Sequence, residues 1–165
     1  MPDYVGFFLD SSRSVIEIPT LEISHPAFSK VHRLVRRPRD LVATLETGEE
    51  VTFTALGMRL RRGAARADLA YSLGVDLGDL GEIIPDEIDR ARAAGQMGVR
   101  PTVVYRSYRS DDLSAPMFGP IRLELAQITR TREGASFDAA APQLNLNRTG
   151  ELYTPDRFPM LRGFL

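Results

Sequence analysis

The chain has 165 residues, a formal net charge of −1 and no cysteine. A single domain of this length buries roughly 70% of the surface that its unfolded chain exposes, so folding requires neither a metal nor a disulfide. The near-neutral charge argues against a general nucleic-acid binder, and the missing cysteines exclude disulfides and thiolate catalysis. No stretch approaches the ~20 apolar residues of a membrane-spanning helix, so we expect no membrane insertion.

Alternating apolar residues near the N-terminus predict the first strands. In SVIEIPTLEIS, Ile18 and Leu21 stand on opposite parities on either side of Pro19. This change of phase predicts a bulge or an edge position at the proline. The following KVHRLVR predicts a weaker strand.

The segment DLVATLETGEEVTFTAL predicts a β-hairpin, because its two alternating arms flank a turn that contains Gly48. Glu46, Glu49 and Glu50 make the tip of this hairpin acidic. Unpaired charges are costly to bury, so we expect the tip to project and to meet a neighbouring subunit or a channel.

The clearest strand signal is ADLAYSLGVDLG, residues 67–78, in which every second residue is apolar. A helix is predicted at about residues 85–95, because Ile84, Ile88 and Ala91 recur at helical spacing and Gly95 can end it.

Three further strands are predicted in PTVVYRSYR, in PIRLELAQITRTR and in GASFDAA. The second of these changes phase between Leu125 and Ile128. The sum is about eight strands and one helix, which predicts a mainly β domain over residues 1–143. We expect a sandwich or barrel with the helix packed on its flank.

Residues 144–165 have no period, and we expect them to form an extended C-terminal arm. The arm contains Tyr153, Phe158 and Phe164, and its prolines forbid a regular helix or a central strand. Its apolar side chains are too many to leave in water, so we expect it to dock on protein. A neighbouring subunit is the preferred acceptor, and the chain's own domain is the alternative.

Two arginine-rich stretches, HRLVRRPRD and RLRRGAAR, predict a basic face from Arg33 to Arg66 for DNA or for an acidic partner. We expect it to contact an acidic surface on an adjacent subunit, with Arg36 and Arg37 as interface candidates. A solvated strand face is the simpler interpretation. Separate basic and acidic surfaces on one subunit suit head-to-tail contacts in a ring.

Candidate catalytic chemistry is sparse. His25 and His32 are the only histidines, and seven residues separate them in a β region, which does not match a helical metal pair. We interpret both as surface or turn residues, and we expect no catalytic residue, metal ligand or cofactor.

Several local patterns together resemble a known family: TLEISHPAFSK, LETGEEVTFTAL, RPTVVYRSYRSDD, PIRLELAQITRT and LYTPDRFPML. The resemblance is to a phage-encoded family of unknown biochemical function from the tail gene clusters of long-tailed bacteriophages. It implies a structural protein of the tail tip or baseplate, with a fold like that of the tail tube. Such a protein is made in the bacterial host cytoplasm and becomes part of the virion.

The resemblance also implies partners: further copies of the chain in a ring of three- or six-fold order, other tail proteins, and DNA that passes through a channel. A non-enzymatic ring subunit of this kind is the leading hypothesis. A small phage-encoded hydrolase acting on cell wall or peptide is the alternative, and a host-envelope binding module is a third possibility.

Overall fold

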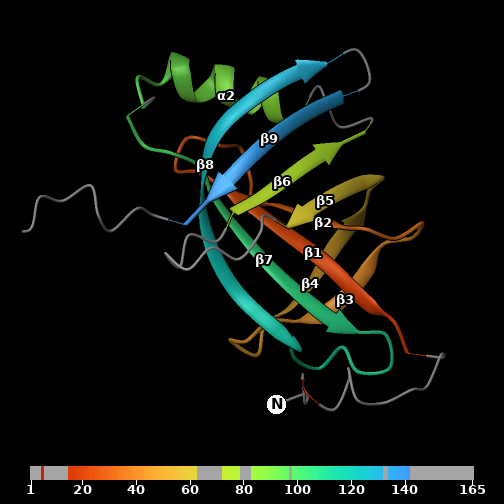
Figure 1. Ribbon diagram of the computed structural model, residues 1–165. Coiled ribbons are helices and arrows are strands. Elements are labelled where there is room, and N and C mark those ends of the chain that lie inside the picture. Colours follow the sequence, from red (N-terminus) through yellow and green to blue (C-terminus); the bar gives the residue numbers. More distant parts are fainter. Residues whose placement is uncertain are drawn as a thin grey trace, which may run out of the picture.

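The computed structural model describes residues 5, 15–62, 72–78, 83–96, 98–131 and 134–141. Within them the helix α2 (Ile83–Ala93) lies beside a single sheet of nine strands (Figure 1). The strands are β1 (Glu17–Ser24), β2 (His32–Val35), β3 (Leu41–Thr44), β4 (Glu50–Ala55), β5 (Met58–Arg62), β6 (Ser72–Leu77), β7 (Thr102–Arg109), β8 (Phe118–Thr131) and β9 (Gly134–Ala140). The predicted mainly β fold with a helix is confirmed. Among the helices described, none has the length and apolar character needed to cross a bilayer.

The strands follow the order β3-β4-β2-β1-β7-β8-β9-β6-β5 across the sheet. Although β4 and β5 belong to opposite arms of the sheet, only Leu56 and Gly57 separate them in the chain. The amide of Leu56 donates to the carbonyl of Val35 at the end of β2, and the amide of Gly78 donates to the carbonyl of Gly57. The chain therefore links the two arms, and the sheet curls around a common interior (Figure 1).

Two hydrophobic cores lie on opposite faces of β1 and β7. The larger core fills the inside of the curl, where Leu21, Tyr105 and Leu123 are fully or almost fully buried. In the smaller core the hairpin β3–β4 covers the outer face, and Phe53 packs edge-on against Tyr108. The central strands are consequently buried on both faces, while the hairpin keeps one exposed face.

The bulge or edge position predicted at Pro19 is wrong. Strand β1 lies inside the sheet between β2 and β7, and its register with β7 runs without a shift from Glu17 to Ser24. The phase of apolar residues changes because Ile18 faces the smaller core, whereas Leu21 faces the larger one. A strand buried on both faces carries apolar residues on both parities.

Other sequence predictions agree with the structure. The register of β8 against β9 shifts between Leu125 and Gln127, where the apolar phase changes. Gly48 adopts a left-handed φ of 84° in the hairpin turn. Gly95 has φ 69°, and its amide donates to the carbonyl of Arg92, as expected of the glycine that ends a helix.

Strand β5 had no counterpart in the sequence prediction. Its residues alternate Met58, Arg59, Leu60 and Arg61, and it pairs with β6 through Leu60↔Val75. The arginines at the alternate positions led us to interpret the segment as a charged surface, so its period-two pattern was not counted as a strand.

Candidate functional site

A buried arginine lies at the centre of the outer face of the sheet. Arg106 on β7 has a side chain that is only 5% exposed, and Glu46 from the hairpin turn receives two of its hydrogen bonds. The Nε–Oε2 distance is 2.8 Å and the Nη2–Oε1 distance is 2.9 Å. Glu22 of β1 lies 3.4 Å from Nη1 of the same guanidinium and 3.4 Å from Nε of Arg33. The four side chains form one ion-pair cluster, defined here as the Arg106 cluster.

Electrostatics favour the ionised forms of Glu46 and Arg106. The hydrogen bonds from Arg106 outweigh the effect of burial and hold the pKa of Glu46 below its usual value. Burial acts to lower the pKa of Arg106, but the hydrogen bonds to Glu46 and the charges of Glu22 and Glu46 raise it overall. Burial also raises the pKa of the nearby Tyr108 phenol to about 12, and its hydroxyl donates to the carbonyl of Thr44. These groups hold the hairpin on the sheet and supply no proton near neutral pH.

The Arg106 cluster changes the interpretation of the acidic hairpin tip. Glu46 is bound to its own β7, so this carboxylate does not project freely. Glu49 and Glu50 are exposed, and neither forms an ion pair with another described residue. Of the three predicted interface carboxylates, these two are the ones left available to a partner.

A second polar cluster fixes α2 to the sheet. Glu87 is 5% exposed and accepts hydrogen bonds from the amide and the hydroxyl of Ser29. Nε2 of His32 lies 3.4 Å from the Glu87 carboxylate, and Nε of Arg90 lies 3.5 Å from it. His32 is itself buried on β2, so its interpretation as a surface or turn residue is wrong.

The order of groups in this second cluster does not suit a nucleophile. In a hydrolytic triad a histidine takes the proton of the serine, and a carboxylate orients that histidine. Here the Ser29 hydroxyl donates directly to Glu87, and the carboxylate lies between serine and histidine. The arrangement docks a helix, and it provides no base for Ser29 among the described residues.

Loss of charge at Glu87 should loosen α2. Burial opposes ionisation of this carboxyl, but the hydrogen bonds from Ser29, the His32 ring 3.4 Å away and the charge of Arg90 prevail, so its pKa lies below the usual value. A carboxyl whose pKa is lower in the folded state than in the unfolded state stabilises the fold when the pH is above its unfolded-state pKa. This stabilisation is lost as the pH falls through the folded-state pKa. We expect Glu87→Gln to reduce the free energy of unfolding at pH 7 by about 1–3 kcal/mol.

Urea unfolding followed by circular dichroism between pH 7 and pH 3 measures this effect. The variant should lose less stability on acidification than the wild type does. Asp89→Asn, on the exposed side of α2, is the matched control and should lie within about 0.5 kcal/mol of wild type at pH 7. Equal acid sensitivity in Glu87→Gln and wild type would contradict the role of Glu87.

His25 connects two loop segments through hydrogen bonds to their backbone. Its Nδ1 accepts a hydrogen bond from the amide of Ala27, so Nε2 carries the proton and donates to the carbonyl of Val99. Both ring nitrogens are therefore engaged with backbone. Across the described ranges, no group of three or more His, Asp or Glu side chains could hold a metal ion.

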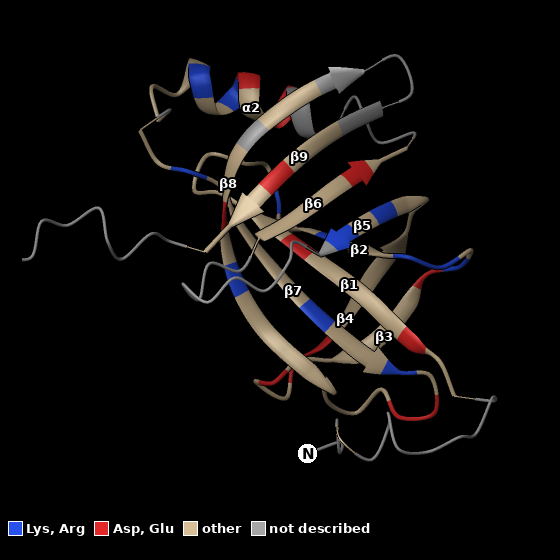
Figure 2. Ribbon diagram, in the orientation of Figure 1, with Lys and Arg blue, Asp and Glu red and all other residues tan. Residues whose placement is uncertain are grey.

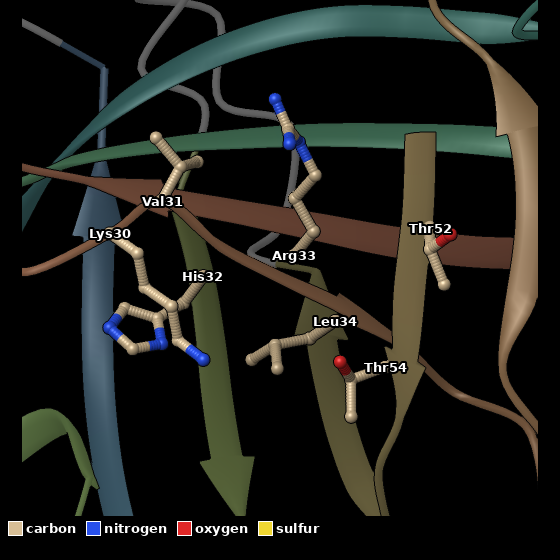
Figure 3. Close-up of a pocket in the computed structure, with 7 residues that line it drawn as sticks. All are labelled: Lys30, Val31, His32, Arg33, Leu34, Thr52 and Thr54. Carbon is tan, nitrogen blue, oxygen red and sulfur yellow. The ribbon is translucent and has the colours of Figure 1, made fainter. Parts of the chain in front are cut away.

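A pocket of about 250 Å³ lies between β2 and β4 (Figure 3). It exists because these parallel strands pair only through Leu34↔Thr54 and Val35↔Ala55. Thr52 and Thr54 form one side, while Arg33 points away from His32 and Leu34, as alternation along a strand requires (Figure 3). Among the described residues that line this pocket there is no carboxylate, so they provide no pair of a carboxylate and a cationic group.

Exposed charges of opposite sign lie on separate parts of the molecule. The loop that follows β2 carries the exposed Arg36 and Arg39, the half-buried Arg37 and, at its end, Asp40, and β5 carries Arg59; none of these arginines forms an ion pair with another described residue. Figure 2 shows this basic side on the right of the view and the red turn between β3 and β4 at the lower left. We call the first region the basic loop and the second the acidic turn.

The basic face predicted from sequence is thus smaller than the two arginine-rich stretches. Arg33 belongs to the Arg106 cluster, and Arg61 pairs with Asp76 at 2.9 Å. Arg66 and the three arm residues Tyr153, Phe158 and Phe164 lie outside the described residues. Sequence reasoning missed Arg106, for which the alternation of PTVVYRSYR gave no signal.

Comparison with known proteins gives a family but no activity. No curated protein matches the chain significantly. One family model, described as "Domain of unknown function (DUF1833)", matches residues 8–140 and so covers all nine strands and α2. The chain therefore belongs to the DUF1833 family.

Proposed function

We propose that this protein is a structural subunit of a bacteriophage tail tip or baseplate, which assembles head-to-tail with copies of itself and contacts neighbouring tail proteins. The observation that carries the proposal is the separation of the basic loop from the acidic turn. Membership of a family known from phage-like proteins also supports it. The subunit acts in the virion, without a cofactor and without catalysis.

The charge arrangement favours a heterologous contact. Arg36 and Arg37 have no ion-pair partner among the described residues, and neither have Glu49 and Glu50. A surface that binds a different surface on the next copy produces a ring when the rotation closes. Exposed ion pairs contribute only about 0–1 kcal/mol each, so the charges select orientation and partner more than they set affinity.

The Arg106 cluster prepares the acidic turn for such a contact. Two hydrogen bonds fasten the turn to β7 through Glu46, and Tyr108 fastens the neighbouring Thr44. Glu49 and Glu50 therefore extend from a turn that is already ordered in the free subunit. Ordering a loop on binding would cost free energy, and a preorganised turn avoids part of that cost.

Charge reversal tests the proposal. We expect Arg36→Glu with Arg37→Glu to abolish ring assembly while the monomer stays folded, because like charges then face each other. Glu49→Arg with Glu50→Arg should have the same effect. A chain with all four substitutions regains complementary charges and should assemble again. The mass in solution, measured with and without the neighbouring tail proteins, reports the outcome.

The control variant, Lys30→Glu with Arg92→Glu, reverses the charge of two residues that lie away from the basic loop. It should assemble like the wild type. Raising the salt concentration should weaken wild-type assembly, because exposed charges are screened. Normal assembly of both double variants would refute the proposed contact, and so would failure of the fourfold variant to recover.

A further inference from the structure

An apolar pocket lies between α2 and β8, outside the regions discussed above. Its volume is about 300 Å³, and its apolar lining consists of Ile88, Val99, Pro101, Leu125, Ala126 and Ile128. Figure 1 shows α2 beside the arm of the sheet that contains β8 and β9. The volume is at the lower end of the range for small-molecule sites, and it suits one large side chain better than an extended ligand.

The pocket leaves apolar surface in contact with water. Val99, one of its lining residues, is 51% exposed, and Ala126 is exposed as well. Two of the described lining residues are polar, and both are already engaged: Nε2 of His25 donates to the Val99 carbonyl, and Arg100 lies 3.5 Å from Glu124. The described lining therefore offers apolar contact and no charged group without a partner.

The described part of the chain ends next to this pocket. In the register of β9 against β8, Ala140 is opposite Glu124, the neighbour of the lining residue Leu125. The amide of Leu125 donates to the carbonyl of Pro101, a second lining residue. An extended chain advances about 3.3–3.6 Å per residue, so the ten residues 142–151 that precede the segment 152–165 are long enough, at about 33–36 Å, to reach the pocket from the end of β9.

We propose that this pocket binds the C-terminal segment 152–165 of the same chain, with Phe158 as the side chain that enters it. Phe158 has no polar group to satisfy, and it stands beside Pro159, Met160 and Leu161 in an apolar sequence. A short tether holds the segment at a high effective concentration near its own pocket. The place where β9 ends thus favours the chain's own domain over the neighbouring subunit preferred from sequence alone.

Cysteine cross-linking in the full-length chain tests this pairing, because the natural sequence has no cysteine. We expect Ala126→Cys with Phe158→Cys to form an intramolecular disulfide under mild oxidation, visible as a faster band on non-reducing gels. Val42→Cys with Phe158→Cys, whose first position on β3 is also exposed, should give at least tenfold less of this product. Predominantly intermolecular dimers would overturn the proposal, and so would equal yields from the two pairs.

A second test uses the full-length chain and does not depend on assembly. Carboxypeptidase digestion followed by mass spectrometry measures how fast residues 152–165 are removed. Ala126→Arg should speed this removal at least tenfold, because it places a charge in the apolar pocket. Phe158→Ala should speed it similarly, whereas Tyr153→Ala should have a smaller effect. An unchanged rate in Ala126→Arg would overturn the proposal without affecting the ring hypothesis.

Discussion

Replacing Gly119 with alanine should lower the free energy of unfolding by about 2–5 kcal/mol, from backbone strain and a steric clash together. Gly119 stands at the start of β8 with φ 97°, a conformation that residues with a side chain rarely adopt. A Cβ at this position would lie 2.6 Å from the carbonyl oxygen of Tyr105 and 3.3 Å from Cα of Arg106. Both neighbours are backbone atoms, so β8 itself would have to move away from β7.

Gly57→Ala is the matched control for this substitution. A Cβ at Gly57 would meet nothing within 4 Å, and its φ is not in the left-handed range. Its free energy of unfolding should stay within about 0.5 kcal/mol of wild type. Urea unfolding followed by far-ultraviolet circular dichroism measures both variants. Equal stability of Gly119→Ala and wild type would show that β8 does not approach Arg106 as closely as described.

Arg106→Met should cost about 3 kcal/mol of stability, because it removes the central cation of a buried ion-pair network, leaves Glu46 without its hydrogen-bond partner and leaves Glu22 with Arg33 alone. The Glu22 side chain is 16% exposed and that of Glu46 is 32% exposed, so Glu22 has less access to water once the guanidinium is gone. We also expect the turn between β3 and β4 to detach from β7. Hydrogen exchange at the amides of β3 should therefore accelerate in this variant.

A double-mutant cycle separates the pair energy from general damage. In Arg106→Met with Glu46→Gln, the loss of stability should be smaller than the sum of the two single losses, since residues in one network are not additive. Arg92→Met removes an arginine of the exposed pair with Asp89 and should change stability by less than about 0.5 kcal/mol. Strictly additive losses would show that Arg106 and Glu46 do not interact in solution.

Local pattern predicted most of the elements, because their signals lie within a few residues. Leu73, Val75 and Leu77 are buried at alternate positions of β6, as the period-two pattern requires. The phase change in β8 coincides with its register shift, and Gly95 ends α2. The pairing partner of each strand had no such local signal, so the phase change at Pro19 was interpreted as a bulge or an edge position, although β1 pairs on both sides.

The polar clusters could not be predicted, because their members are distant in sequence. Arg106 and Glu46 are 60 positions apart, and Ser29 and Glu87 are 58 apart. Glu46 looked like one of three equivalent turn carboxylates. What distinguishes it is that the hairpin folds over the outer face of β7 and brings this one residue to a buried guanidinium, which only the tertiary structure determines.

The pairing of β1 with β7 also has a consequence for synthesis on the ribosome. Translation delivers β1 and β2 early, but the second hydrogen-bonded edge of β1 meets its partner only when residues 102–109 have emerged. Until then the apolar side chains of β1 that face the larger core lack most of their neighbours. Such long-range pairing slows folding and prolongs the exposure of strand edges to aggregation. Lower growth temperature or chaperone overproduction should therefore raise the soluble yield of this chain more than it would for a helical protein of equal length.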